Sequence, residues 1–170
     1  MNIVASTSAS DVPTPYEYFG TVKEDWLDEN GHMNVAFYMS AFDDGGEVFF
    51  QDPGIGWDYT RQGEFTIFVV SSKVDYRQEL FRGDPFFVTT RLLDFNEKLV
   101  HTYYEIGHRD SSYIAATAEI LYAHVSFATR KSAPFDQSII SRLEQIREAH
   151  ASLPSIPSLG AGIGIRKSSG

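Results

Sequence analysis

Residues 34–54 read NVAFYMSAFDDGGEVFFQDPG, and this stretch decides the fold class. Between Ala36 and Gln51, apolar side chains occur at helical spacing on nearly every side, which is typical of a helix buried inside a protein. Asn34 is a suitable N-cap for this helix, and the sequence Asp-Pro-Gly at 52–54 ends it. The pair Gly45-Gly46 costs a helix about 1 kcal/mol per residue relative to alanine. We therefore expect a sheet to approach the helix closely at these glycines.

The chain on both sides of this helix has the alternating pattern of strands. Aromatic and polar residues alternate over residues 16–22, before the helix, which predicts one strand there. Four further strands are expected after the helix, at residues 65–77, 86–93, 99–106 and 113–129, and their short connections imply antiparallel neighbours. An amphipathic helix is expected at 137–152. The predicted fold class is α+β, with an antiparallel sheet wrapped around a long central helix.

The length of 170 residues and a hydrophobic content of 42% fit one domain with a substantial core. We expect this domain to span residues 15–153, including the C-terminal helix. A leader at 1–14, rich in Ser, Thr and Pro, and a Ser/Gly/Pro-rich tail at 154–170 are predicted to be flexible. One helix half-wrapped by a curved sheet cannot bury the open side of that sheet. The sequence therefore predicts a homo-oligomer, either a dimer or a dimer of dimers.

The composition excludes several classes of function. A net charge of −9 argues against nucleic-acid binding, which needs a dense basic face. No stretch approaches the roughly 20 apolar residues of a membrane span, and the first ten residues lack the features of a secretory signal, so we expect no membrane contact and a cytoplasmic protein. The absence of cysteine removes thiolate chemistry and Cys-based metal sites. Catalysis must use carboxylate, His, Ser, Tyr or backbone groups.

The loop before the central helix carries the strongest chemical signal. Residues 26–34 read WLDENGHMN and place a carboxylate, two amides and an imidazole at Asp28, Asn30, Asn34 and His32. The loop leads into a helix start, where unpaired backbone N–H groups and the positive end of the helix dipole favour developing negative charge. This arrangement suits hydrolysis of an activated carbonyl. Asp-x-Asn-Gly is also common turn chemistry, so a purely structural role for Asp28 stays open.

Other candidate sites are weaker. His101, Glu105 and His108 could suggest a metal site, but residues 101 and 108 face opposite sides of a strand, so we expect no metal. The glycines at positions 160, 162 and 164 have no strand before them and no helix after them, so they do not form a dinucleotide loop.

The order of elements and the loop sequence resemble the hotdog-fold acyl-CoA thioesterases of the 4-hydroxybenzoyl-CoA thioesterase-like superfamily. Their loop reads roughly D-x-D/N-x-x-G-H-x-N-N-x-x-Y, and the corresponding stretch here, residues 26–38, reads WLDENGHMNVAFY. The resemblance covers residues 16–130. Two positions depart from the pattern, because Trp26 replaces the first Asp and Val35 the second Asn. Within the superfamily the chain is similar to the thioesterases associated with carnitine dehydrogenase, thought to act on betainyl-CoA, which share W-[IL]-D-x-N-G-H-M and an H-V pair, here His124-Val125.

The resemblance implies hydrolysis of an acyl-CoA thioester to free acid and CoA. It identifies Asp28 as a general base or a nucleophile, with Asn30 and His32 orienting the carboxylate or the water. Backbone N–H groups around Asn34 and Val35 would polarise the carbonyl oxygen. A block similar to plant acyl-carrier-protein thioesterases, YRQEL at 76–80, would supply a further carboxylate from Glu79. No cofactor is expected, because coenzyme A enters as part of the substrate.

Substrate binding follows from the chemistry of that substrate. Coenzyme A carries three phosphate groups, so we expect basic residues at strand ends to converge on it; the candidates are Arg77, Arg82, Arg109, Arg130 and Lys131. The acyl pocket should be lined by aromatic residues such as Phe42, Trp57 and Tyr59. If the substrate is a betaine, these rings and a nearby carboxylate could hold its quaternary ammonium group by cation–π contact. Two alternatives stay open. A hotdog hydratase or dehydratase would pair a loop His with Asp43 or Glu47, and a non-catalytic homologue would only bind acyl-CoA.

Overall fold

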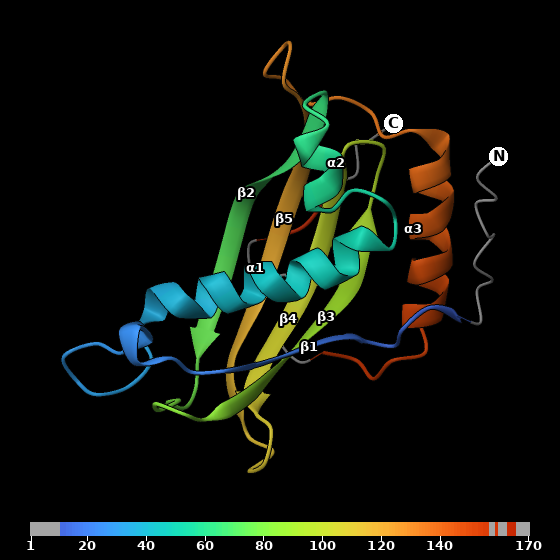
Figure 1. Ribbon diagram of the computed structural model, residues 1–170. Coiled ribbons are helices and arrows are strands. Elements are labelled where there is room, and N and C mark those ends of the chain that lie inside the picture. Colours follow the sequence, from blue (N-terminus) through green and yellow to red (C-terminus); the bar gives the residue numbers. More distant parts are fainter. Residues whose placement is uncertain (1–10, 157–158, 160–162, 166–170) are drawn as a thin grey trace, which may run out of the picture.

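A five-stranded antiparallel sheet forms one layer of the molecule, and the predicted central helix crosses one face of it (Figure 1). The structure is a computed structural model that describes residues 11–156, 159 and 163–165. The strand order is β1-β3-β4-β5-β2. The strands are β1 (Tyr16–Thr21), β2 (Phe65–Tyr76), β3 (Pro85–Phe95), β4 (Leu99–His108) and β5 (Ile114–Ser126), and the helices are α1 (Val35–Gln51), α2 (Trp57–Arg61), α3 (Gln137–His150) and a 3₁₀ turn at Glu24–Trp26. The predicted α+β class and the central helix are confirmed.

Helix α1 begins and packs as the sequence predicts. The Asn34 side chain accepts a hydrogen bond from the N–H of Ala36 at 3.0 Å, which confirms the N-cap. At Gly45, a Cβ atom would lie 2.5 Å from Cγ1 of Val88 on β3, and the Thr90 hydroxyl donates to the Gly45 carbonyl at 2.9 Å. The expected close approach between helix and sheet is confirmed. α1 packs mainly against β1, β3 and β4.

One short helix, α2, has no counterpart among the predicted elements. Its N-cap residue, Gly56, makes no side-chain capping hydrogen bond. Instead the carboxylate of Glu47, on α1, accepts the Trp57 N–H at 2.8 and 3.0 Å. A distant residue therefore supplies the cap that local sequence lacks.

Parts of the predicted leader and tail pack on the domain. Val12 is buried, and the Pro13 carbonyl accepts a hydrogen bond from Nε2 of His150, at the end of α3, at 2.9 Å. In the tail, the Pro154 carbonyl accepts from the Arg91 guanidinium on β3. Residues 1–10, 157–158, 160–162 and 166–170 lie outside the described residues. The domain boundaries at 15 and 153 stay a prediction.

Strand β2 forms one edge of the sheet and exposes apolar side chains. Phe68, Val69 and Val70 are 39%, 50% and 54% exposed, and the pairing with β5 is interrupted by a bulge between Val69 and Ser71. Within the described part of the chain, β2 pairs with β5 alone. A long apolar edge is a template for pairing with a further strand.

None of the described helices is long and apolar enough to cross a membrane.

Candidate functional site

The loop before α1 folds into a tight hairpin that brings Asp28 next to His32. The N–H of Asp28 donates to the His32 carbonyl at 3.0 Å, and the N–H of Gly31 donates to the Asp28 carbonyl at 2.9 Å. Gly31 has φ +80°, which a side chain would strain, so the glycine is required by the three-residue turn. The local sequence alone thus determines the spacing of these two side chains.

The carboxylate of Asp28 has both a structural contact and a chemical neighbour. Its Oδ1 accepts the N–H of Asn30 at 2.8 Å, which is the turn contact that Asp-x-Asn-Gly predicts. The same oxygen lies 3.8 Å from Nδ1 of His32. The Asp28 side chain is 20% exposed, so water can reach it.

Glu79 comes to the same place from a distant part of the chain. The Met33 N–H donates to the Leu80 carbonyl at 2.8 Å, and the Tyr113 hydroxyl donates to the Glu79 carbonyl at 2.7 Å. Nε2 of His32 consequently lies 3.7 Å from Oε1 of Glu79, whose side chain is 61% exposed. The structure therefore brings Asp28, His32 and Glu79 together, with the imidazole between the two carboxylates.

The start of α1 offers one backbone donor rather than two. The Asn34 N–H donates to the Trp26 carbonyl at 2.9 Å, so it is already occupied. For the N–H of Val35, the structure gives no acceptor among the residues it describes. Trp26, which replaces the family's first Asp, is buried and stacks on Phe37 with ring centroids 5.4 Å apart. Its role in this chain is packing.

A cleft of about 250 Å³ opens beside this group of residues. Burial raises the pKa of Tyr38, one of its lining residues, to about 12, so that hydroxyl stays neutral and can donate a hydrogen bond. Asp28, Asn30 and Asn34 are not in the lining, but Oδ1 of Asp28 lies 3.8 Å from Nδ1 of the lining residue His32. The lining residues are His32, Met33, Val35, Tyr38, Tyr76, Arg77, Gln78 and Glu79.

A second cavity, of about 160 Å³, lies between α1, α2 and β2. Of the three predicted acyl-pocket residues, only Trp57 lines it. Phe42 is fully buried and packs on Tyr104, with ring centroids 5.6 Å apart. The lining residues are Asp43, Glu47, Phe50, Ile55, Gly56, Trp57, Thr60, Thr66, Ile67, Val69 and Tyr122.

Tyr59 and His124 form a separate structural contact. The Nδ1 atom of His124 faces the Ala133 carbonyl at 2.8 Å and must carry the proton, so Nε2 accepts from the Tyr59 hydroxyl at 2.9 Å. The His124 ring stacks between Phe65 and Phe135. His124, part of the H-V pair in the sequence, thus fixes α2 to the sheet.

The predicted basic residues do not converge within one chain. Arg77 lines the cleft, whereas the exposed Arg82 pairs with Glu24 and Arg109 lies 3.4 Å from Asp110. Arg130 and Lys131 follow β5 at the opposite end of the sheet. The Arg130 guanidinium lies over the ring of Phe68, 5.6 Å from its centroid.

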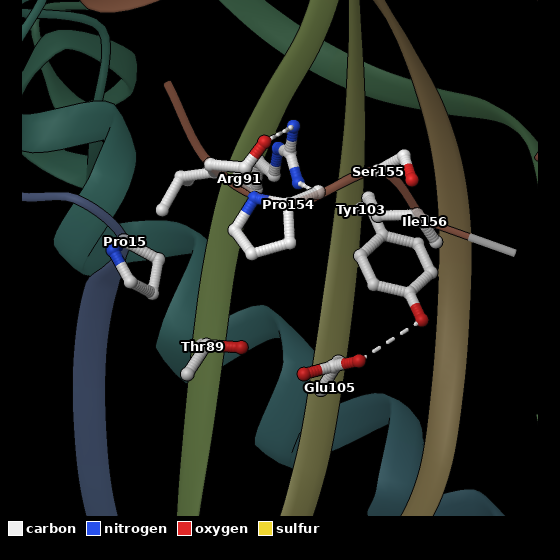
Figure 2. A pocket seen from close by; sticks show the side chains of 9 residues that line it. Pro15, Thr89, Arg91, Tyr103, Glu105, Pro154, Ser155 and Ile156 are labelled. Atoms are coloured by element: carbon white, nitrogen blue, oxygen red, sulfur yellow. Dashed lines mark hydrogen bonds between the residues drawn. The ribbon is translucent and has the colours of Figure 1, made fainter. Parts of the chain in front are cut away.

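A third cavity, of about 260 Å³, lies on the face of the sheet turned away from α1 (Figure 2). Thr89 and Tyr103 line it, and because side chains alternate along a strand, their neighbours Thr90 and Tyr104 face α1. The Tyr103 hydroxyl donates to Glu105 at 3.2 Å. None of the predicted site residues lies there.

The hydratase alternative finds no support in Glu47. Both of its oxygens accept the Trp57 N–H, and Oε1 also accepts from the Gln51 side chain at 3.1 Å. Glu47 therefore anchors α2.

Among the described residues, no three His, Asp or Glu side chains are grouped so that they could hold a metal ion.

Comparison with known proteins identifies the family. A sequence model described as the thioesterase-like superfamily matches residues 22–143. The betainyl-CoA thioesterase of Pseudomonas aeruginosa is 29% identical over 156 residues, which cover 92% of this chain and 97% of that protein. The L-carnitine dehydrogenase/betainyl-CoA thioesterase of Ruegeria pomeroyi is 33% identical over 84% of this chain, but the match covers only 28% of that longer protein.

Solved structures agree with the fold. A Staphylococcus aureus protein solved in complex with CoA has a TM-score of 0.79 at 24% identity, covering 89% of this chain and 96% of that one. The 1,4-dihydroxy-2-naphthoyl-CoA thioesterase from Synechocystis has a TM-score of 0.68 at 18% identity, covering 82% and 97%. The predicted resemblance to hotdog-fold thioesterases is confirmed.

Proposed function

Since the chain belongs to the thioesterase-like superfamily and is an acyl-CoA thioesterase, we propose that it cleaves its substrate in the cleft beside His32, with Asp28 as the catalytic carboxylate. The observation that supports this most is the position of His32, 3.8 Å from Asp28 and 3.7 Å from Glu79, at a cleft that also contains Val35. A base, an orienting group and a backbone donor are thereby within one small region.

Two chemical routes use this arrangement. As a general base, Asp28 takes a proton from water while the water oxygen bonds to the thioester carbon, and the carbon–sulfur bond then breaks. As a nucleophile, Asp28 itself bonds to that carbon, expels the thiolate and forms an anhydride that water hydrolyses. In both, the Val35 N–H stabilises the negative charge on the carbonyl oxygen. His32 orients Asp28 or the water, and Glu79 holds the other side of the imidazole.

We propose betainyl-CoA as the substrate, on the basis of the named activity of the Pseudomonas aeruginosa relative, which matches nearly end to end. Hydrolysis would release CoA and a trimethylammonium acetate. No cofactor takes part in either chemical route. We propose a cytoplasmic location.

We further propose a homodimer built through β2. This strand is twelve residues long, lies at the sheet edge and exposes Phe68, Val69 and Val70. Pairing β2 with β2 of a second copy, antiparallel about a two-fold axis, would satisfy the free backbone groups and cover these side chains. Whether such dimers pair again into tetramers is left to measurement of the molecular mass.

This dimer would also complete the coenzyme A groove. In an antiparallel pair, the end of β2 in one copy lies beside the start of β2 in the other. Arg77 follows the end of β2, and Arg130 lies over Phe68 near its start. Arg77 would therefore share the phosphate groups with Arg130 and Lys131 of the partner subunit.

The direct test is the variant Asp28→Asn, assayed by release of free thiol from betainyl-CoA. The amide oxygen of Asn can still accept the Asn30 N–H, so the turn and the dimer are expected to persist. Turnover should fall by about 10²–10⁴-fold, the usual contribution of a positioned base. Asp25→Asn, an exposed carboxylate in the preceding 3₁₀ turn, is the matched control and should retain activity. Unchanged turnover in Asp28→Asn would contradict the catalytic role, and no thiol release by the wild-type protein would favour a binding protein.

A further inference from the structure

The cavity between α1, α2 and β2 combines aromatic walls with negative charge. Trp57 and Tyr122 contribute rings to its lining, and Asp43 and Glu47 contribute carboxylates. Its volume of about 160 Å³ is well above the roughly 10–15 Å³ that one water molecule needs. A compact organic group therefore fits inside it.

The negative charge in this cavity lacks a cation. In the part of the chain that the structure describes, no Lys, Arg or His side chain lies within ion-pair distance of Asp43 or Glu47. The Glu47 oxygens are engaged by the Trp57 N–H, which leaves the Asp43 carboxylate available at the cavity. Although the Asp43 side chain is exposed, desolvation of its carboxylate in this region, and then the neighbouring Asp44 and Glu47, raise its pKa. A positive ligand group would relieve this repulsion.

A quaternary ammonium group has the matching chemistry. It cannot donate hydrogen bonds, so it is held by nearby negative charge and by the faces of aromatic rings, with tryptophan the strongest. Trp57 is 43% exposed and its indole is not needed for the core. Asp43 and Trp57 on one cavity supply both interactions.

Distance shows which catalytic loop this cavity can serve. Asn34 and Asp43 are nine residues apart on α1, which is about 14 Å at 1.5 Å per residue. In a betainyl thioester, only one methylene separates the ammonium nitrogen from the carbonyl carbon. The cavity therefore lies too far along the helix to serve the loop of its own chain.

A second copy closes this gap. Ile67 and Val69, near the start of β2, line the cavity, whereas Tyr76, at the end of β2, lines the cleft beside His32. Antiparallel pairing of β2 with its copy brings the start of one strand to the end of the other. In the proposed dimer, the cavity of one protomer would therefore face the cleft of its partner.

We infer that this cavity binds the positively charged end of the acyl group and that Asp43 is the residue that determines specificity for it, acting on a thioester held in the cleft of the other protomer. The inference rests on the proposed function. It adds the side chain that recognises the charge of the acyl group, Asp43, and the protomer that supplies it.

The first experiment compares two substrates of equal shape. Betainyl-CoA and 3,3-dimethylbutyryl-CoA differ in having a nitrogen cation or a neutral carbon at the branch point, so the ratio of their kcat/KM values measures charge recognition. Asp43→Asn should lower this ratio by roughly 10–100-fold, as expected for loss of a nearby opposite charge. Asp44→Asn is the control, because Asp44 contacts the Tyr18 hydroxyl at 3.3 Å and does not line the cavity. That variant should change the ratio much less than Asp43→Asn does, because the Asp44 charge reaches the cavity only indirectly.

The possible outcomes are distinct. A ratio unaffected by Asp43→Asn overturns the inference, and so does equal efficiency of the wild-type enzyme on the two substrates, although both leave the thioesterase assignment intact. Hydrolysis of neither substrate contradicts the proposed function itself.

The second experiment tests whether the two chains share a site. Asp28→Asn and Asp43→Asn chains, carrying different affinity tags, are co-expressed, and the mixed dimer is purified. If the cavity serves the partner's cleft, one site of the mixed dimer carries both changes and the other neither, so betainyl-CoA activity should return to about half that of the wild type. If each chain serves itself, both sites stay defective, and activity no higher than that of the two parent variants overturns the inference.

Discussion

The two ends of helix α1 hold their carboxylates in different ways. At the C-terminal end, Asp52 accepts the Tyr16 hydroxyl at 2.5 Å and the Arg142 guanidinium at 2.5 and 2.9 Å, and the side chains of this ion pair are only 17% and 12% exposed. At the N-terminal end, His32 lies 3.8 Å from Asp28 and 3.7 Å from Glu79, beyond hydrogen-bond distance. The first end is saturated with donors, whereas the second keeps acceptor capacity for a ligand.

This difference separates stability from chemistry along one helix. A carboxylate whose oxygens are fully bonded cannot take a proton from water without losing those bonds, so Asp52 is unsuited to catalysis. Asp28 has one contact to its own turn and a neighbouring imidazole. We expect substitutions at the C-terminal end to change the free energy of unfolding, and those at the N-terminal end to change turnover or KM.

The largest effect on the free energy of unfolding should follow from Asp52→Asn. It removes the charge that Arg142 and Tyr16 share, so the free energy of unfolding should fall by about 2–3 kcal/mol, while kcat stays near the wild-type value. Urea unfolding measures the first quantity and thiol release the second. Asp58→Asn is the control, because its pair with Arg61 is exposed and should contribute under about 0.5 kcal/mol. Equal unfolding free energies for the two variants would remove the contrast between the helix ends.

A smaller effect is expected at the other end, from Arg77→Gln. Arg77 lines the cleft beside His32, so loss of its charge should raise KM for the acyl-CoA by about tenfold without altering the unfolding free energy. Arg82→Gln is the matched comparison, since Arg82 is already paired with Glu24 at an exposed site. Similar KM values for both variants would show that proximity to the cleft does not decide coenzyme A binding.

The smallest expected effect is a pH dependence at the C-terminal end. His150 is buried and its ring contacts the ring of Tyr16. Its Nδ1 accepts the Leu92 N–H at 3.0 Å, and its Nε2 donates to the Pro13 carbonyl. A second proton on the ring would therefore break the hydrogen bond from Leu92. Burial is the main reason that the pKa of His150 is lowered below 6.5. The unfolded chain then binds more protons below pH 6.5, and stability present above that pH is lost as pH falls, by at most about 1.4 kcal/mol per pH unit.

Unfolding free energies at pH values of about 5.5 and 7.5 check this expectation. His150→Gln keeps an acceptor and a donor without titrating, so it should reduce the slope. His101, whose pKa burial also lowers, should supply the slope that remains, with the same sign. An unchanged slope in His150→Gln would place the titrating group elsewhere.

The sequence predicted those features that local interactions determine. The N-cap at Asn34, the end of α1 before Pro53 and the turn around Gly31 each depend on residues within a few positions. The proximity of Asp28 and His32 has the same origin. Periodicity was sufficient to predict the positions of the strands, of which β1, β3 and β4 pack against α1.

What the sequence did not reveal depends on contacts between distant residues. Helix α2 begins where Glu47 accepts the Trp57 N–H, ten residues away. The sequence around Tyr59 did not predict the hydrogen bond between its hydroxyl and His124, 65 positions later in the chain. The position of Glu79 near His32 depends on the Met33–Leu80 hydrogen bond. A pattern that covers one element at a time contains none of this information.

The two glycines at positions 45 and 46 allow close packing that affects the position of the whole catalytic region. With the helix backbone lying directly on Val88 and under the Tyr104 hydroxyl, α1 can neither roll nor slide along the sheet without a steric clash. The contacts at the middle of α1 therefore fix the direction in which its first turn points. Replacing either glycine by a larger residue should tilt α1 and misalign the Val35 amide with the thioester. A change among fully buried atoms would therefore lower turnover at a site several helical turns away.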